Sequence, residues 1–231
     1  MIDAVFFDLY GTLARFHPPT EVLQATACRE FGMEVTPEGI IRGYAAADDF
    51  MARENARVPI FQREEPERKT FFAEYQRLIL RGAGVSASTE LARRVWERVS
   101  QIPKDLALFD DVLPALEELK RRRLVLGLIS NINRNMEELT RRLDIGRYLD
   151  FWVTSQEVGA NKPDPRIFEV ALRKAHTWPS RALHVGDQYN SDVVGAYDVG
   201  IRPLLLDREG ILPEPGICPK IRGLGEVLQY V

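Results

Sequence analysis

Five short apolar runs alternate with helical segments, and this alternation is the feature that most limits the folds open to the chain. The runs cover residues 2–7, 124–130, 150–154, 182–185 and 203–206. They are apolar throughout rather than alternately polar, which is typical of parallel strands buried on both faces. Stripes at helical spacing, such as Phe168, Leu172 and Ala175, separate the last four runs. We therefore predict an α/β fold with a doubly wound, Rossmann-like parallel sheet.

The first two apolar runs are separated by a long interval without any strand-like pattern. Apolar residues recur there at helical spacing instead, as at Leu23 and Ala27. At about 150 residues per domain, 231 residues correspond to about one and a half domains. We therefore predict an all-helical domain over residues 15–104, inserted into a core of residues 1–14 and 105–231.

Composition excludes several classes of protein. The 31 Lys and Arg residues nearly balance the 34 Asp and Glu residues, so no global basic field is expected to hold nucleic acid. The longest strongly apolar run, residues 124–129, is far shorter than the roughly 20 residues that span a bilayer. Cys28 and Cys218 have no metal-site spacing and are expected to be reduced thiols. We expect a cytoplasmic protein with a small-molecule substrate and without nucleic-acid or membrane partners, whereas the oligomeric state is left open.

Polar residues follow the predicted strands at the points where these strands end. Asp8 ends the first strand, Ser130 and Asn131 end the second, and Asp187 ends the fourth. Lys162 follows the third strand after a short loop. Because ligands of parallel α/β sheets bind outside the carboxyl ends of the strands, these side chains are expected to converge on one site. Alone, each could be a helix cap or a solvated loop residue, and it is their joint occurrence that predicts a site.

Four ordered motifs carry a family resemblance: Asp8-Leu-Tyr-Gly-Thr-Leu13, Ser130-Asn131, Lys162-Pro-Asp164 and Gly186-Asp-Gln-Tyr-Asn-Ser-Asp192. Together they resemble the haloacid dehalogenase-like hydrolase superfamily over essentially the whole chain. The helical insertion is similar to the cap domain of that superfamily. A cap would shape the substrate pocket and close over it.

The transferred group is expected to be held by a nucleophile, a cation and hydrogen-bond donors. Asp8 would form a covalent aspartyl intermediate, and Lys162 would keep Asp8 charged and offset charge on the transferred group. Ser130 would donate a hydrogen bond to a phosphoryl oxygen. Thr12 and Asn131 complete the predicted substrate-binding set.

A magnesium site is expected beside the nucleophile. Asp8 and Asp187 would hold Mg²⁺, a hard cation that takes oxygen ligands. The resemblance implies that the backbone carbonyl of Tyr10 is a further ligand. Asp192 would hold a water on the metal or anchor its own loop.

Tyr10 departs from the phosphatase pattern. Most phosphatases of the superfamily carry a second Asp at this position as the general acid and base, and a tyrosine of pKa about 10 is a poor proton shuttle at neutral pH. Tyrosine there is similar to the 2-haloacid dehalogenases, which need no metal. Those enzymes carry Ser where Asp187 stands and Tyr where Phe168 stands, and Arg42 could act as their anion-binding arginine, although an exposed helix arginine is the simpler interpretation.

Asp187 indicates a metal and a phosphate, whereas Tyr10 indicates a halide, and we give more weight to Asp187. Water or a good leaving group can substitute for a missing general acid, but a metal ligand is harder to replace. The sequence thus favours a Mg²⁺-dependent hydrolase of a small phosphorylated substrate. A metal-independent 2-haloacid dehalogenase is the alternative, and a non-catalytic binder of a phosphorylated ligand is a third. His17 is interpreted as a loop residue, His184 as structural, and residues 121–123 as an exposed basic face.

Overall fold

The structure is a computed structural model that describes the backbone of residues 1–231 and all side chains except those of Ala56 and Phe61. The chain divides into two compact units. A core unit comprises Met1–Arg15 and Ala107–Val231, and a helical unit comprises Phe16–Leu106. The sequence-based boundaries lie at 14/15 and 104/105.

A six-stranded sheet runs through the core unit in the order β5-β4-β1-β6-β7-β8. Every neighbouring pair is parallel, which confirms the predicted fold class. Its strands are β1 (Ala4–Phe7), β4 (Val125–Ser130), β5 (Phe151–Thr154), β6 (Ala182–Gly186), β7 (Arg202–Leu206) and β8 (Lys220–Ile221). All but β8 were predicted; β8 has two residues, too few for a periodicity.

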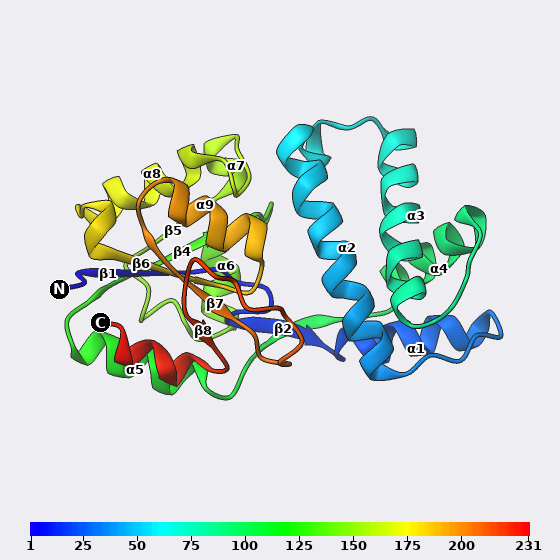
Figure 1. Ribbon diagram of the computed structural model, residues 1–231, viewed down its shortest axis with the longest axis horizontal. Coiled ribbons are helices and arrows are strands. Elements are labelled where there is room, and N and C mark those ends of the chain that lie inside the picture. Colours follow the sequence, from blue (N-terminus) through cyan, green and yellow to red (C-terminus); the bar gives the residue numbers. More distant parts are fainter. The chain divides into compact units, whose positions relative to one another are not determined.

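Helices cover both faces of this sheet, with α8 and α9 on one side and α5 on the other (Figure 1). The α-helices are α5 (Val112–Arg121), α6 (Met136–Arg142), α7 (Ser155–Val158), α8 (Pro165–Ala175) and α9 (Gly195–Asp198). Shorter or irregular turns are η2 (Pro179–Arg181), η3 (Tyr189–Val194) and η4 (Leu224–Gln229).

Close packing fixes the central strands beneath α8. Phe6 and Phe168 are fully buried in one apolar cluster. The Phe6 and Phe151 rings meet edge to face with centroids 5.8 Å apart. A Cβ on Gly127 would lie 2.4 Å from the Phe151 ring, so only glycine leaves room for that ring on the neighbouring strand. Densely packed interiors have low compressibility, so this packing holds the strand ends in register.

The helical unit contains α1 (Thr20–Glu30), α2 (Pro37–Arg57), α3 (Glu65–Gly82), α4 (Thr89–Gln101) and the short turn η1 (Ile60–Gln62). Two glycines bring the backbones of α2 and α3 together. A Cβ on Gly43 would lie 2.2 Å from the Ile79 carbonyl oxygen, and one on Gly82 would lie 2.3 Å from the Gly43 Cα. A buried pair, Gln24 and Gln76, exchanges two side-chain hydrogen bonds of 3.0 and 2.7 Å.

The predicted helical segment begins later than expected. Residues Ala14–His17 form strand β2, which belongs to a separate two-stranded sheet with β3 (Asp105–Leu108). His17 therefore ends a strand rather than lying in a loop, although it is exposed. Both strands have four residues, and their pairing joins segments far apart in the sequence, so no local period reveals it.

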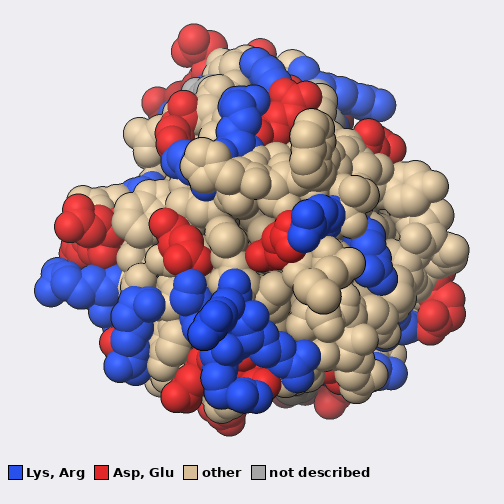
Figure 2. Space-filling model, turned by 90° about the vertical axis from the view of Figure 1, so that its left-hand side faces the viewer, with Lys and Arg blue, Asp and Glu red and all other residues tan. Residues whose placement is uncertain are grey.

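Surface charges of the core unit are mixed in sign. Figure 2 shows basic side chains gathered low on one face, with acidic side chains among and around them. Residues 121–123 are exposed, as predicted. Arg121 and Arg122 both pair with Glu118, at 2.7 and 3.0 Å.

Cys28 and Cys218 are both free thiols. Among the helices as described, none is both long and apolar enough to cross a membrane.

Candidate active site

Three neighbouring strands bring the predicted site residues to one edge of the sheet. In the parallel register, Phe7 on β1 lies opposite Leu128 on β4 and Val185 on β6. Asp8 follows β1, and its N–H donates to the Val185 carbonyl at 2.9 Å. Ser130 is the last residue of β4 and is buried. The strand ends therefore place the first, second and fourth motifs side by side.

Lys162 connects two carboxylates at this edge. Its side chain is 2% exposed, and Nζ donates to Asp8 Oδ1 and to Asp192 Oδ1, each at 2.6 Å. Asn131 holds the backbone of Lys162 from both sides: its Oδ1 accepts from the Lys162 N–H at 2.7 Å, and its Nδ2 donates to the Lys162 carbonyl at 3.1 Å. The side chain of Asn131 thus fixes the catalytic lysine candidate, and its binding of substrate stays a prediction.

The charged groups of this cluster lie in contact and shift one another's pKa values. Burial raises the pKa of Asp8 to about 6, although Lys162 counteracts it. Burial also acts to raise the pKa of Asp192, but Lys162 and His184 outweigh it and lower that pKa to about 2. Burial disfavours the charged form of Lys162, yet the two carboxylates raise the pKa of its ammonium above its ordinary value. Lys162 is therefore charged at neutral pH. A second cation beside Asp8 would stabilise the charged form of its carboxyl group.

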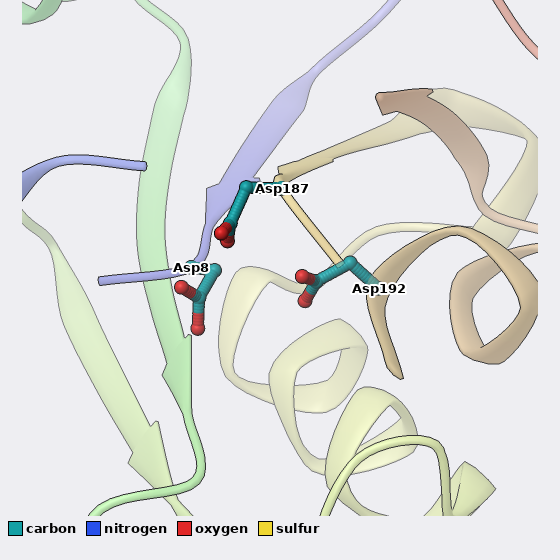
Figure 3. A group of neighbouring side chains, drawn as sticks. All are labelled: Asp8, Asp187 and Asp192. Carbon is teal, nitrogen blue, oxygen red and sulfur yellow. The ribbon is translucent and has the colours of Figure 1, made fainter. Parts of the chain in front are cut away.

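The donor set fits a hard divalent cation. One carboxylate oxygen from each of Asp8, Asp187 and Asp192 lies within 4.8 Å of the others, and Figure 3 shows the carboxylates of Asp187 and Asp192 directed toward Asp8. Asp192 is already occupied, because Oδ1 accepts from Lys162 and His184 and Oδ2 accepts from the Gln188 N–H at 3.1 Å. The arrangement therefore suits a metal held chiefly by Asp8 and Asp187, with Asp192 anchoring the lysine and its own loop.

Gly11 gives Asp187 its space. The Gly11 φ is +78°, a left-handed conformation, and a Cβ there would lie 2.2 Å from Asp187 Oδ2. The buried Thr12 hydroxyl lies 3.5 Å from the other oxygen, Oδ1. The turn after β1 thus touches both oxygens of the carboxylate that the fourth motif supplies.

We expect Gly11→Ala to weaken metal binding. The new methyl would displace the Asp187 carboxylate, so the Mg²⁺ concentration giving half-maximal activity should rise by about tenfold or more. Gly84→Ala is the matched control, because Gly84 has φ +80° and no atom within 4 Å of the new Cβ. Both variants carry the backbone strain of about 1–2 kcal/mol. Titration of activity with Mg²⁺ distinguishes the two variants. An equal Mg²⁺ requirement in both would contradict the role of Asp187 as a metal ligand positioned beside Gly11.

Tyr10 is half-buried in the same turn. Burial raises the pKa of its phenol above the ordinary value, with Arg134 opposing the shift. The phenol is therefore protonated at neutral pH and is a poorer general base than an exposed tyrosine. Arg42, the other residue of the dehalogenase interpretation, is exposed on α2 in the helical unit.

His184 is the residue that the sequence did not assign to the site. It lies within β6, fully buried, with Nε2 3.0 Å from Asp192 Oδ1. Phe168, where the similar dehalogenases carry Tyr, packs edge-on against its ring, with centroids 5.3 Å apart. A histidine inside an apolar strand gives no local signal of a partner eight residues later.

Residues 2–200 match the family model of the haloacid dehalogenase-like hydrolases. The chain belongs to this hydrolase family. A human relative, haloacid dehalogenase-like hydrolase domain-containing protein 3, is 31% identical over 89% of this chain and 82% of its own length. A ribulose-1,5-bisphosphate 5-phosphatase of Halopiger xanaduensis is 26% identical over 90% of this chain and 85% of its own.

Solved structures share the fold. The L-2-haloacid dehalogenase RSc1362 covers the whole of this chain with 98% of its own, at a TM-score of 0.68 and 21% sequence identity. At this identity, the likeness supports the fold and not the reaction. The family and its phosphatase relatives indicate that this chain is an enzyme, and they favour a phosphatase over a dehalogenase, as the sequence predicted.

Proposed function

We propose that this hydrolase is a Mg²⁺-dependent phosphatase that acts on small phosphorylated substrates through an aspartyl-phosphate on Asp8. One observation carries the proposal: Asp187 brings a second carboxylate within 4.8 Å of the Asp8 carboxylate, which already forms an ion pair with Lys162. These two carboxylates, one of which is the nucleophile, would repel the carboxylate of a haloacid, whereas with a divalent cation they suit a phosphoryl group. A phosphatase among the relatives adds support.

The first step would be attack of Asp8 on phosphorus. A bond forms between an Asp8 carboxylate oxygen and phosphorus while the phosphorus–oxygen bond to the leaving group breaks, and the leaving oxygen takes its proton from water. Lys162 would offset the negative charge of the phosphoryl oxygens, and the buried Ser130 hydroxyl would donate to one of them. Mg²⁺ held by Asp8 and Asp187, when bound, would supply further charge neutralisation.

The second step would release phosphate. Water would attack the phosphorus of the acyl phosphate while the bond to the Asp8 oxygen breaks. The protons of this water would remain on the released phosphate or pass to solvent, and Asp8 would return to its carboxylate form. We propose that the helical unit serves as a cap that excludes bulk water and selects the substrate.

A metal-controlled comparison of two substrates tests the proposal. We expect the protein to hydrolyse p-nitrophenyl phosphate in the presence of Mg²⁺. Hydrolysis should stop when EDTA is added and resume when Mg²⁺ is restored. The same preparation should release no chloride from 2-chloropropionate. Chloride release that EDTA leaves intact would support instead the dehalogenase alternative, which Tyr10 favours. Mg²⁺ binding without either product would support a non-catalytic binder of phosphorylated ligands.

Because Tyr10 stands where the acid would be, we expect a strong dependence on the leaving group. Hydrolysis of alkyl phosphates should be about 10²–10⁴-fold slower than in an enzyme that has a general acid. Aryl and acyl phosphates should be affected less, because their leaving groups depart without a proton. Tyr10→Asp should therefore raise kcat for a sugar phosphate much more than for p-nitrophenyl phosphate. Equal turnover of the two substrates by the wild type would contradict this expectation.

A further inference from the structure

A buried histidine stands behind the catalytic lysine candidate. His184 is fully buried on β6, and its Nε2 lies 3.0 Å from Asp192 Oδ1, the oxygen that also accepts from Lys162. Among the side chains that the structure describes, its Nδ1 has no hydrogen-bond partner. The ring thus makes one polar contact, and that contact is to the lysine's anchor.

The surroundings fix which nitrogen carries the hydrogen. A carboxylate only accepts hydrogen bonds, so Nε2 is the donor to Asp192. A hydrogen on Nδ1 would be a buried donor without an acceptor, which is costly. Phe168 meets the ring edge to face at an interplanar angle of 88°, and this packing limits rotation of the imidazole.

Asp192 is held from several segments at once. Lys162 reaches it from the loop before α8, His184 from β6, and the Gln188 N–H from the loop after β6. On the remaining side a Cβ at Gly186 would lie 2.2 Å from the Asp192 Cγ, so the carboxylate packs directly against the end of the strand.

We infer that His184 is a positioning residue: its Nε2–H fixes the Asp192 carboxylate, which in turn holds the Lys162 ammonium beside Asp8. Its effect on catalysis rests on the proposed phosphatase function, whereas the chain of contacts does not. The chain from His184 through Asp192 to Lys162 is separate from the contacts of Gly11 and Thr12 with Asp187. The first chain ends on Asp8 and does not touch Asp187, so loss of His184 should lower the rate of phosphoryl transfer much more than the affinity for metal.

Three variants test the effect on the rate. His184→Leu removes the donor, His184→Gln keeps an amide N–H near the position of Nε2, and His176→Asn is a control at the exposed C-cap of α8, where φ is +49°. We expect His184→Leu to lower kcat for p-nitrophenyl phosphate by about 10–100-fold. His184→Gln should stay within about threefold of the wild type. In both variants the Mg²⁺ concentration for half-maximal activity should change much less than kcat. Wild-type kcat in His184→Leu, equal losses in the two variants, or a rise in the Mg²⁺ requirement as large as the loss of kcat would overturn the inference.

A spectroscopic measurement tests the same chain of contacts without activity. The protein has three histidines, so His184→Gln assigns the His184 signals in ¹⁵N NMR spectra of the ring nitrogens. We expect a ring with hydrogen on Nε2 and a bare Nδ1. Lys162→Met should shift the His184 signals and leave those of His17 and His176 in place. The opposite tautomer, or signals unmoved by Lys162→Met, would overturn the positioning role, whereas these results in a protein without phosphatase activity would refute only the proposed function.

Discussion

Asp8→Asn is expected to lower kcat by at least about 10⁴-fold. An amide is not a nucleophile toward phosphorus, and it also removes a negative charge from the pair that would hold the metal. The substitution leaves size and burial unchanged at a position that is 8% exposed, so the fold should persist. Steady-state hydrolysis of p-nitrophenyl phosphate, with circular dichroism as a check on folding, measures the effect.

Asp198→Asn is the matched control for this variant. Asp198 ends α9 and is exposed, so the same exchange should leave kcat within about twofold of the wild type. A folded Asp8→Asn protein that keeps more than a few per cent of wild-type activity would show that another group attacks the substrate.

Lys162→Met is expected to damage both rate and stability. Removing the ammonium leaves Asp8 and Asp192 as buried carboxylates without their shared cation, which should lower the free energy of unfolding by about 3–5 kcal/mol. The rate should fall by about 10²–10³-fold, because the charge of the phosphoryl group loses its fixed counterion. Urea unfolding and steady-state kinetics measure the two effects.

The loss of stability should depend on pH in a defined direction. In the wild type the pKa of Asp192 is lowered to about 2, so its contribution to stability is present above the unfolded pKa, about 3.9, and is lost as pH falls toward 2. In Lys162→Met the buried carboxylates would have raised pKa values, and protonation would relieve them as pH falls from 7 toward 4. The stability difference between the two proteins should therefore be largest at neutral pH and narrower near pH 4.

A second substitution separates stability from catalysis. Lys162→Met/Asp192→Asn removes one of the two unpaired charges, so we expect it to recover part of the lost stability and none of the lost activity. Recovery of activity in the double variant would show that Lys162 acts only by neutralising Asp192. Equal instability of the single and double variants would contradict the assigned charge network.

Sequence patterns predicted the sheet wherever a strand is buried on both faces. Apart from His184 and the terminal Ser130, the strands β1, β4 and β6 are apolar, and their ends carry Asp8, Ser130 and Asp187. Parallel pairing then aligns those ends for any length of the loops between them. This is why residues far apart in the sequence could be assigned to one edge of the sheet from hydropathy and chain order alone.

What the sequence could not predict depends on partners rather than on periods. Strands β2 and β3 have four residues each, and the helices of the helical unit lie between them in the sequence. The clamp of Asn131 on the Lys162 backbone joins two loops, and the His184–Asp192 contact joins a strand to an irregular turn. Such contacts follow from tertiary packing, so neither hydropathy nor motif spacing indicates them.

Chemical trapping of the intermediate tests the central claim most directly. Wild-type protein would be mixed with an acyl phosphate and Mg²⁺, quenched in acid within the first turnovers, and digested for mass spectrometry. We predict one phosphoryl group on the peptide that contains Asp8, absent when EDTA replaces Mg²⁺ and absent in Asp8→Asn. Continuing phosphate release with no phosphoryl group on that peptide would contradict the account.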